Sequence, residues 1–175
     1  MEAPTLTTQR LILRATAAED FEPSAAMWAD EAVVRHIGGQ PSSPTDSWGR
    51  MLRFPGLWAL LGYGYWTVAE RATGRFVGQA GLADFKRDMT PSIAGVPEAG
   101  YAFIPDAHGK GYATEAMTAV LAWSDEALDD PRTCALIHPD NAASLRVADK
   151  LGFADRAEAV LNGQATALVW RRRGG

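Results

Sequence analysis

The stretch YAFIPDAHGKGYATEA, residues 101–116, decides how the rest of the chain is interpreted. It begins as an apolar strand that ends at Pro105, continues through a turn with two glycines, and opens a helix near Gly111. The first turn of a helix leaves backbone N–H groups without intrahelical partners, and the helix dipole adds positive potential there. Gly109 and Gly111 let a ligand approach this backbone closely, and Lys110 adds a positive charge. The stretch therefore predicts a cradle for a pyrophosphate, although a glycine-rich turn without a ligand has the same local pattern.

The segments around this stretch predict a mixed α/β domain that extends over residues 1–175. We expect helices over residues 20–30, 48–61, 111–128 and 141–151. Pro55 and Gly56 are expected to break the second helix, and a loop is expected over 37–47. We expect strands over residues 7–14, 63–70, 76–82, 98–104, 132–137, 153–160 and 165–172, with a turn at Asn162–Gly163 joining the last two.

Composition limits the class of protein. The 175 residues are 47% hydrophobic and 22% charged, a balance that favours a globular domain over a disordered chain. No apolar run approaches the about 18 residues of a membrane helix, so we expect no membrane partner. The net charge of −4 argues against a nucleic-acid partner. A single cysteine, Cys134, cannot form an intramolecular disulfide or a zinc cage, so we expect a buried free thiol, no metal and a cytoplasmic location.

Three motifs follow one another along the chain. Residues 108–113, HGKGYA, have Gly111 and Ala113 at the last two positions of the pattern Q/R-x-x-G-x-G/A, with His108 where Gln or Arg is usual. Residues 138–153, HPDNAASLRVADKLGF, fit N-x-x-S-x-x-x-x-x-K-L-G-F, and residues 6–14, LTTQRLILR, fit T-x-R-L-x-L-R. The first pattern resembles the acetyl-CoA pyrophosphate loop of the GNAT superfamily of N-acetyltransferases, and the other two resemble its RimJ/RimL-type branch. The resemblance covers residues 6–153, most of the chain.

This resemblance implies a fold and a cosubstrate. The fold is a central, mostly antiparallel sheet of six to seven strands, flanked by helices and splayed open between the strands at 98–104 and 132–137. Acetyl-CoA would enter this gap, with no metal involved, and a backbone N–H near 101–103 would stabilise charge on the thioester oxygen. The resemblance implies these cofactor-binding residues: Tyr101, Phe103, Ile104, His108, Gly109, Lys110, Gly111, Tyr112, Ala113, Thr114, Asn141 and Ser144.

The activity implied is direct attack of a primary amine on the thioester in a ternary complex. An amine that is protonated at neutral pH must first lose a proton. Glu98, at the start of the strand that leads to the glycine loop, is the first candidate for this base, although it also reads as a solvated strand-end carboxylate. Weaker candidates are Asp84, His36 and His138. Ser144 stands where the branch has a serine, and we assign it a hydrogen bond to the departing sulfur; helping to cap the helix after Asn141 is its other interpretation.

The sequence leaves the identity of the acceptor amine open. Members of the branch acetylate protein N-terminal α-amines or small-molecule amines, and the net charge of −4 favours a cationic acceptor through steering. An aromatic-walled acceptor pocket and plain core packing both account for Trp48, Trp58, Trp66, Tyr63 and Tyr65. The alternative function is an acyl-CoA-binding sensor or regulatory module with little catalysis. Dimers are common in the family, so a homodimer is compatible with the resemblance.

Overall fold

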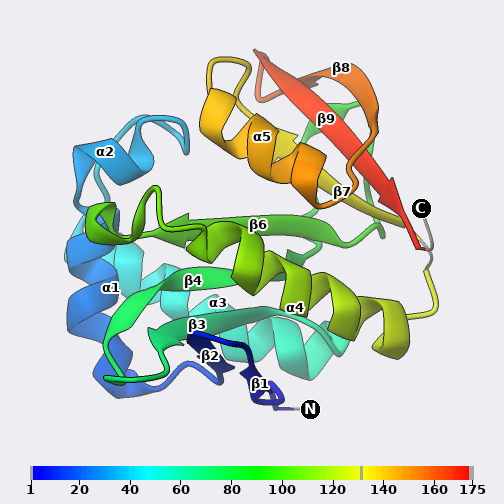
Figure 1. Ribbon diagram of the computed structural model, residues 1–175. Coiled ribbons are helices and arrows are strands. Elements are labelled where there is room, and N and C mark those ends of the chain that lie inside the picture. Colours follow the sequence, from blue (N-terminus) through cyan, green and yellow to red (C-terminus); the bar gives the residue numbers. More distant parts are fainter. Residues whose placement is uncertain (1, 131, 174–175) are drawn as a thin grey trace.

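The computed structural model describes residues 2–130 and 132–173, and a nine-stranded sheet lies at its centre (Figure 1). The strands occur in the order β1-β2-β3-β4-β6-β7-β9-β8-β5, and only β6 and β7 pair in parallel. Their bounds are β1 Leu6–Thr7, β2 Leu11–Arg14, β3 Tyr65–Glu70, β4 Phe76–Ala83, β5 Met89–Thr90, β6 Glu98–Phe103, β7 Arg132–Ile137, β8 Asp155–Leu161 and β9 Gln164–Arg172. The predicted mixed α/β fold with a mostly antiparallel, splayed sheet is confirmed.

The sheet has more strands than the six to seven expected, for two local reasons. The segment predicted as one strand over 7–14 divides into β1 and β2, because the chain turns between them and the Thr8 N–H donates to the Leu11 carbonyl (2.9 Å). The segment between β4 and β6, where the sequence predicts no strand, contributes the two-residue strand β5, which pairs with β8 at the sheet edge. The Asn162–Gly163 turn is confirmed, since both residues have the positive φ (49° and 78°) that a two-residue hairpin turn needs.

Helices cover both faces of the sheet. Their bounds are α1 Phe21–Trp28, α2 Glu31–Val34, α3 Pro44–Leu61, α4 Tyr112–Ala127 and α5 Ala142–Lys150, with short 3₁₀ turns at Ala18–Asp20 and Pro105–Ala107. In Figure 1, α4 and α5 lie in front of the sheet and α3 lies behind it. Within residues 2–130 and 132–173, no helix has both the length and the apolar character that crossing a bilayer requires.

Helix α3 differs from the prediction at both its start and its middle. It begins at Pro44, inside the expected loop, because Ser43 caps it: the Ser43 hydroxyl accepts from the Asp46 N–H (3.1 Å). It also runs unbroken through Pro55. Buried side chains on one stripe hold it against the sheet, and these are Met51, Phe54 and Trp58. This packing outweighs the one hydrogen bond that proline removes.

Three tryptophans form the centre of the core between α3, β3 and α4. Trp58 meets the Trp66 ring edge-to-face at 4.7 Å between centroids, and Trp123 lies 5.2 Å from each of them. The Trp58 and Trp66 indole N–H groups donate to the carbonyls of Tyr65 (3.0 Å) and Pro4 (2.7 Å). Core packing is therefore the correct interpretation of Trp58 and Trp66.

Candidate active site

The parallel neighbours β6 and β7 touch at one end only. A single register pair joins them, Glu98 with Cys134, where the Cys134 N–H donates to the Pro97 carbonyl (3.0 Å). The Ile104 N–H donates to Val77 on β4 (3.0 Å). Because successive residues of a strand direct their N–H groups to opposite neighbours, the N–H groups of Tyr101 and Phe103 point to the β7 side. The two strands thus diverge from Glu98 onward and leave inner edges that no described strand pairs.

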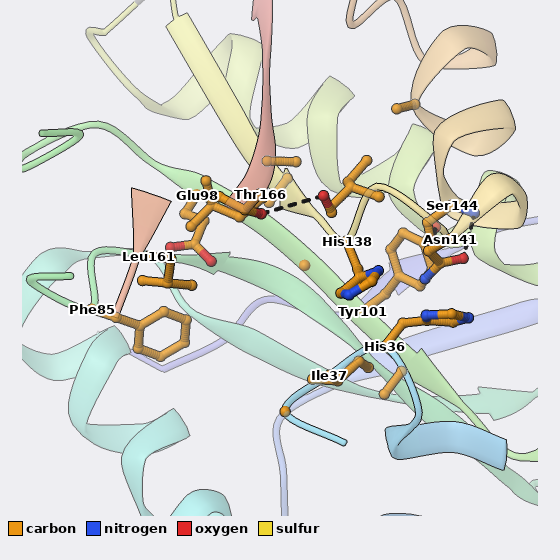
Figure 2. A pocket seen from close by; sticks show the side chains of 18 of the residues that line it. His36, Ile37, Phe85, Glu98, Tyr101, His138, Asn141, Ser144, Leu161 and Thr166 are labelled. Atoms are coloured by element: carbon orange, nitrogen blue, oxygen red, sulfur yellow. Dashed lines mark hydrogen bonds between the residues drawn. The ribbon is translucent and has the colours of Figure 1, made fainter. Parts of the chain in front are cut away.

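A cavity of about 730 Å³ opens at this divergence (Figure 2). Residues of β6, β7 and α5 line it, together with side chains of α1, α3 and the segment after α2. Its size falls within the range of small-molecule sites, which is about 300–1,000 Å³. Glu98, Tyr101, Asn141 and Ser144 all line the cavity; in Figure 2 the last three lie close together, and Glu98 lies apart from them.

Glu98 is buried in the cavity wall and carries a fixed partner. The residue is 5% exposed, and both carboxylate oxygens accept from the Arg87 guanidinium, Oε2 from Nε (2.9 Å) and Oε1 from Nη2 (2.7 Å). This paired arrangement replaces the solvated carboxylate that was the other interpretation of Glu98. Each carboxylate oxygen keeps a further lone pair, so Glu98 can still accept a hydrogen bond from a ligand.

Ser144 lies on α5, and its side chain meets that of Tyr101 in the cavity wall. The Tyr101 hydroxyl donates to Ser144 Oγ (3.0 Å), and the Asn141 side chain caps α5 by accepting from the Ser144 N–H (3.1 Å). Burial raises the pKa of Tyr101, which keeps its hydroxyl protonated as a donor. Because Ser144 Oγ accepts from Tyr101, its own hydrogen remains available to another acceptor. Capping by Asn141 and an outward-directed Ser144 hydroxyl are therefore compatible.

The glycine loop lies between β6 and α4. Gly109 and Gly111 have positive φ (73° and 78°), and nothing lies within 4 Å of the place that a Cβ on Gly109 would take. Helix α4 starts without a capping side chain from the described residues, so its first N–H groups are free to meet a ligand. Open backbone at the positive end of a sixteen-residue helix fits a pyrophosphate.

Residues of the N-terminal motif hold this loop in place. Arg10 Nη1 donates to the Lys110 carbonyl (2.8 Å), and Arg10 Nε donates to Glu115 Oε2 (2.7 Å) in the first turn of α4. The Thr8 hydroxyl and the Arg10 N–H both donate to Glu115 Oε1 (2.6 and 2.8 Å). These bonds give the Thr-x-Arg part of the motif a physical role, because they hold the glycine loop against the N-terminal segment.

Two of the predicted cofactor-binding residues of the loop have side chains that already form hydrogen bonds within the protein. The His108 ring forms a hydrogen bond between Nε2 and the Phe103 carbonyl (2.8 Å), and the Tyr112 hydroxyl donates to Glu70 Oε1 (3.2 Å). None of the predicted residues from 103 to 114 lines the cavity; Phe103 ends β6, and the others come after it. Any contact that they make with a ligand is therefore expected to come mainly from the backbone.

The weaker candidates for the base lie at different places. His36 and His138 are both in the cavity wall, with their rings 5.3 Å apart between centroids (Figure 2). Asp84 lies outside the wall, and its carboxylate accepts from Lys86 and from the Gly95 N–H (3.0 Å). Cys134 is fully buried, and burial, followed by the nearby Glu98 charge, raises the pKa of its thiol to about 12. The thiol is therefore protonated and unreactive at neutral pH.

The cavity also has walls that the sequence did not reveal. Of the five aromatic residues considered for an acceptor pocket, only Tyr65 lines the cavity. The other Trp, Tyr and Phe residues in the wall are Trp28, Phe54, Phe85, Tyr101 and Phe153. Three arginines reach it as well, Arg50, Arg53 and Arg87. Arg50 and Arg53 are one helical turn apart on α3, and that spacing is the only signal that could have paired them from sequence.

Comparison with known proteins agrees with this geometry. A sequence model of the acetyltransferase (GNAT) domain matches residues 10–154. The uncharacterized N-acetyltransferase YoaA of Bacillus subtilis is 28% identical over 151 residues, which are 86% of this chain and 82% of that protein. A structure from Bordetella pertussis assigned to the GNAT acetyltransferases superposes with a TM-score of 0.83 at 30% identity, over 97% of this chain and 99% of that one.

A ribosomal-protein-S5-alanine acetyltransferase from Vibrio fischeri shares the fold at 19% identity (TM-score 0.73, 98% of each chain). The splayed β6 and β7, the open glycine loop at α4 and the family match over most of the chain lead to one conclusion. The chain belongs to the GNAT family, whose members are acetyl-CoA-dependent acyltransferases.

Proposed function

We propose that this protein, acting as a single domain over residues 1–175, transfers the acetyl group of acetyl-CoA to a primary amine in a ternary complex, and that it belongs to the RimJ/RimL-type branch. The observation that carries the proposal is the cavity at the β6–β7 divergence, where a buried carboxylate and a hydroxyl pair share one wall. The motif of α5, with Asn141 as cap and Ser144 one turn on, supports the branch. The acceptor is either a protein N-terminal α-amine or a small-molecule amine.

Acetyl-CoA supplies the activated acetyl thioester. We propose that the backbone from Gly109 to Thr114 binds its pyrophosphate, and that the inner edge of β6 at Tyr101 and Phe103 binds its arm. The Tyr101 and Phe103 N–H groups point into the gap, where a donor can stabilise negative charge that develops on the thioester oxygen. Asn141 and Ser144 would contact the arm from α5. Since this support comes from backbone groups, side-chain changes at His108 or Lys110 are expected to matter less than changes that move the loop.

Glu98 is proposed to accept the amine proton. An amine nucleophile must be neutral, and a carboxylate within hydrogen-bond reach of it, directly or through one water, can take the proton. Arg87 orients the carboxylate through two hydrogen bonds and leaves a lone pair on each oxygen. His36 and His138 stay alternatives because both line the same cavity.

Ser144 is proposed to donate its hydrogen to the departing sulfur. A thiolate is a good leaving group at neutral pH, so a hydrogen bond is sufficient and a strong acid is unnecessary. Tyr101 contributes by donating to Ser144 Oγ, because this bond directs the serine hydrogen away from Tyr101.

The test is release of free CoA thiol from acetyl-CoA in the presence of peptides with varied N-termini, polyamines and aminoglycosides. We expect Glu98→Gln to lower kcat by about 100-fold and Ser144→Ala by about 10-fold. Ser92→Ala, in an exposed loop, is the matched control and should leave kcat unchanged. If both site variants release CoA at the wild-type rate with every amine, the assignment of these residues is wrong.

The acyl-CoA-binding sensor remains the alternative function, and one pair of measurements separates it from catalysis. Calorimetric binding of acetyl-CoA together with no acetylated product from any amine would favour the sensor. Product formation at any amine would exclude it.

A further inference from the structure

We propose, on the basis of the proposed function, that the acceptor is an amine that carries a carboxylate a few bonds away, and that Arg50 and Arg53 of α3 bind this carboxylate. The chain as a whole is acidic, with a net charge of −4, and that charge alone favours a cationic acceptor. The charges inside the cavity have the opposite balance. Its wall holds three guanidinium groups and one carboxylate among the described residues.

The one carboxylate among the described residues of the cavity wall already has an ion-pair partner. Glu98 is paired with Arg87 through two hydrogen bonds, so these two charges compensate each other. Arg50 and Arg53 make no ion pair and donate no hydrogen bond to any residue that the structure describes. Neither of these two positive charges has an ion-pair partner among the described residues, although the Asp46 carboxylate, one turn before Arg50 on α3, adds a weaker favourable interaction with Arg50.

Arg50 is the more constrained of the two. Its guanidinium lies over the Trp28 ring, 3.9 Å from the centroid, and its Nε is buried without a partner among residues 2–130 and 132–173. Stacking satisfies the face of the guanidinium but none of the N–H donors at its edge. Burial, and next the charge of Arg53, lower the pKa of Arg50, yet a guanidinium stays ionised. A half-buried, ionised fork that no described residue pairs matches the geometry of a carboxylate.

The position of the Arg50 guanidinium indicates that it would meet the acceptor rather than the pyrophosphate of acetyl-CoA. Tyr65 lies close enough to Glu98, Arg87 and Arg50 for all three charges to influence its pKa, which burial raises. A Cβ on Gly100 would collide with the Tyr65 hydroxyl, so these groups gather over the first half of β6. The glycine loop follows the other end of that six-residue strand, roughly 15 Å or more away. Arg50 therefore lies toward the same end of β6 as the proposed base, whereas the cradle proposed for the pyrophosphate follows the other end.

The resulting site combines a carboxylate that can accept from an amine with guanidinium groups that can bind an anion. Glu98 can accept from the amine, while Arg50 and Arg53 can bind a carboxylate of the same molecule. Two sources supply this chemistry, namely a free α-amino acid and a peptide with an acidic side chain near its N-terminus. Polycations such as spermidine would bring like charges to the two arginines and bind poorly.

The experiment compares acceptors that differ only in that charge. The peptides Ala-Glu-Ala-Ala and Ala-Gln-Ala-Ala, both with amidated C-termini, test a side-chain carboxylate. Alanine and alaninamide test an α-carboxylate, and spermidine is the cationic acceptor. We expect the acid of at least one pair to exceed its amide by about 10- to 100-fold in kcat/KM. The pair in which the acid is preferred shows whether the bound carboxylate belongs to a peptide side chain or to a free amino acid.

Variants of the chain assign the preference to α3. Arg50→Gln should reduce the acid-to-amide ratio to near one, and the exposed Arg53→Gln should reduce it in part with no loss of folding. Arg50→Lys keeps the charge but not the fork, so the ratio should fall between these values. Arg35→Gln, on an exposed arginine outside the cavity wall, is the control and should keep the wild-type ratio.

Three outcomes would overturn the inference and leave the proposed function standing. They are equal use of both members of each pair, preferential use of spermidine, and an unchanged ratio in both Arg50→Gln and Arg53→Gln. A preference for succinyl-CoA over acetyl-CoA that Arg50→Gln removes would also overturn it, because the arginines would then bind the donor's acyl chain. Absence of CoA release with every amine contradicts the proposed function instead.

Discussion

Tyr101 contributes to the site through its backbone and its side chain, which makes it the most informative single residue. Changing it to Phe removes the hydroxyl that donates to Ser144 and keeps the ring and the β6 backbone. We expect kcat to fall by about 3- to 10-fold, since Ser144 loses the partner that orients it, with little change in the KM of the acceptor. Steady-state kinetics with saturating acetyl-CoA measure this split.

Tyr63→Phe is the matched control for that prediction, because Tyr63 lies outside the cavity wall. It should leave kcat unchanged. A wild-type kcat in Tyr101→Phe, with Ser144→Ala still impaired, would mean that Ser144 acts without Tyr101.

Single residues also show what the sequence could and could not predict. Asn141 is of a type that often caps helices and stands at the first residue of the predicted helix 141–151, and its side chain does accept from the Ser144 N–H. Glu98 was found from its position on a strand, but its partner Arg87 was not, because it comes from a loop whose course depends on tertiary packing. Arg50 was missed because an unpaired charge can be recognised only once its surroundings are known.

At the scale of elements, the N-terminal turn and α4 act as one unit, because Thr8 and Arg10 bind Glu115 and the Lys110 carbonyl. Arg10→Ala should therefore loosen the glycine loop. We expect the KM for acetyl-CoA to rise by about 5- to 10-fold with kcat nearly unchanged, because the loop is proposed to bind rather than to react. Kinetics with acetyl-CoA varied at saturating amine test this.

Arg156→Ala removes another exposed arginine, which pairs with Asp149 away from the loop, and it should leave this KM unchanged. If Arg10→Ala also leaves it unchanged, the loop holds its shape without the N-terminal turn.

Elements with strong periodicity were predicted well, and those decided by distant contacts were not. The bounds of β7 match the prediction to the residue, and α4 and α5 match within one residue at each end. The break expected at Pro55 is wrong, since the buried stripe of α3 overrides the local effect of proline. The sequence left core packing and an aromatic pocket wall open for Trp58 and Trp66, because aromatic type alone does not separate the two, and the structure shows core packing.

At the scale of the molecule, three ion pairs that involve partly buried carboxylates predict the response to acid. Asp20 is bound by Arg14, Asp125 by Arg171 and Glu115 by Arg10, and in each case hydrogen bonds lower the pKa of the carboxyl despite burial. A carboxyl with a lower pKa in the folded state stabilises the fold above its unfolded pKa, and this contribution is lost as the pH falls through the folded value.

We therefore expect Tm to be nearly constant from pH 8 to about 5 and to fall steeply below about pH 4, where unfolded carboxyls begin to take up protons. Thermal unfolding followed by circular dichroism across this pH range is the measurement. Arg14→Ala should flatten the decline, because its bidentate bond to Asp20 is one source of the difference. A Tm that stays level to pH 3 would contradict this account of the charges.

The divergence of β6 and β7 has a consequence for handling the protein. Two rows of peptide groups that no described strand pairs face each other in the middle of the sheet, where most sheets have none. Unpaired strand edges are templates on which other chains can add strands and aggregate. A molecule bound in the gap would cover these edges as a neighbouring strand does. The solubility of the protein on storage is therefore expected to be higher with the ligand bound than without it.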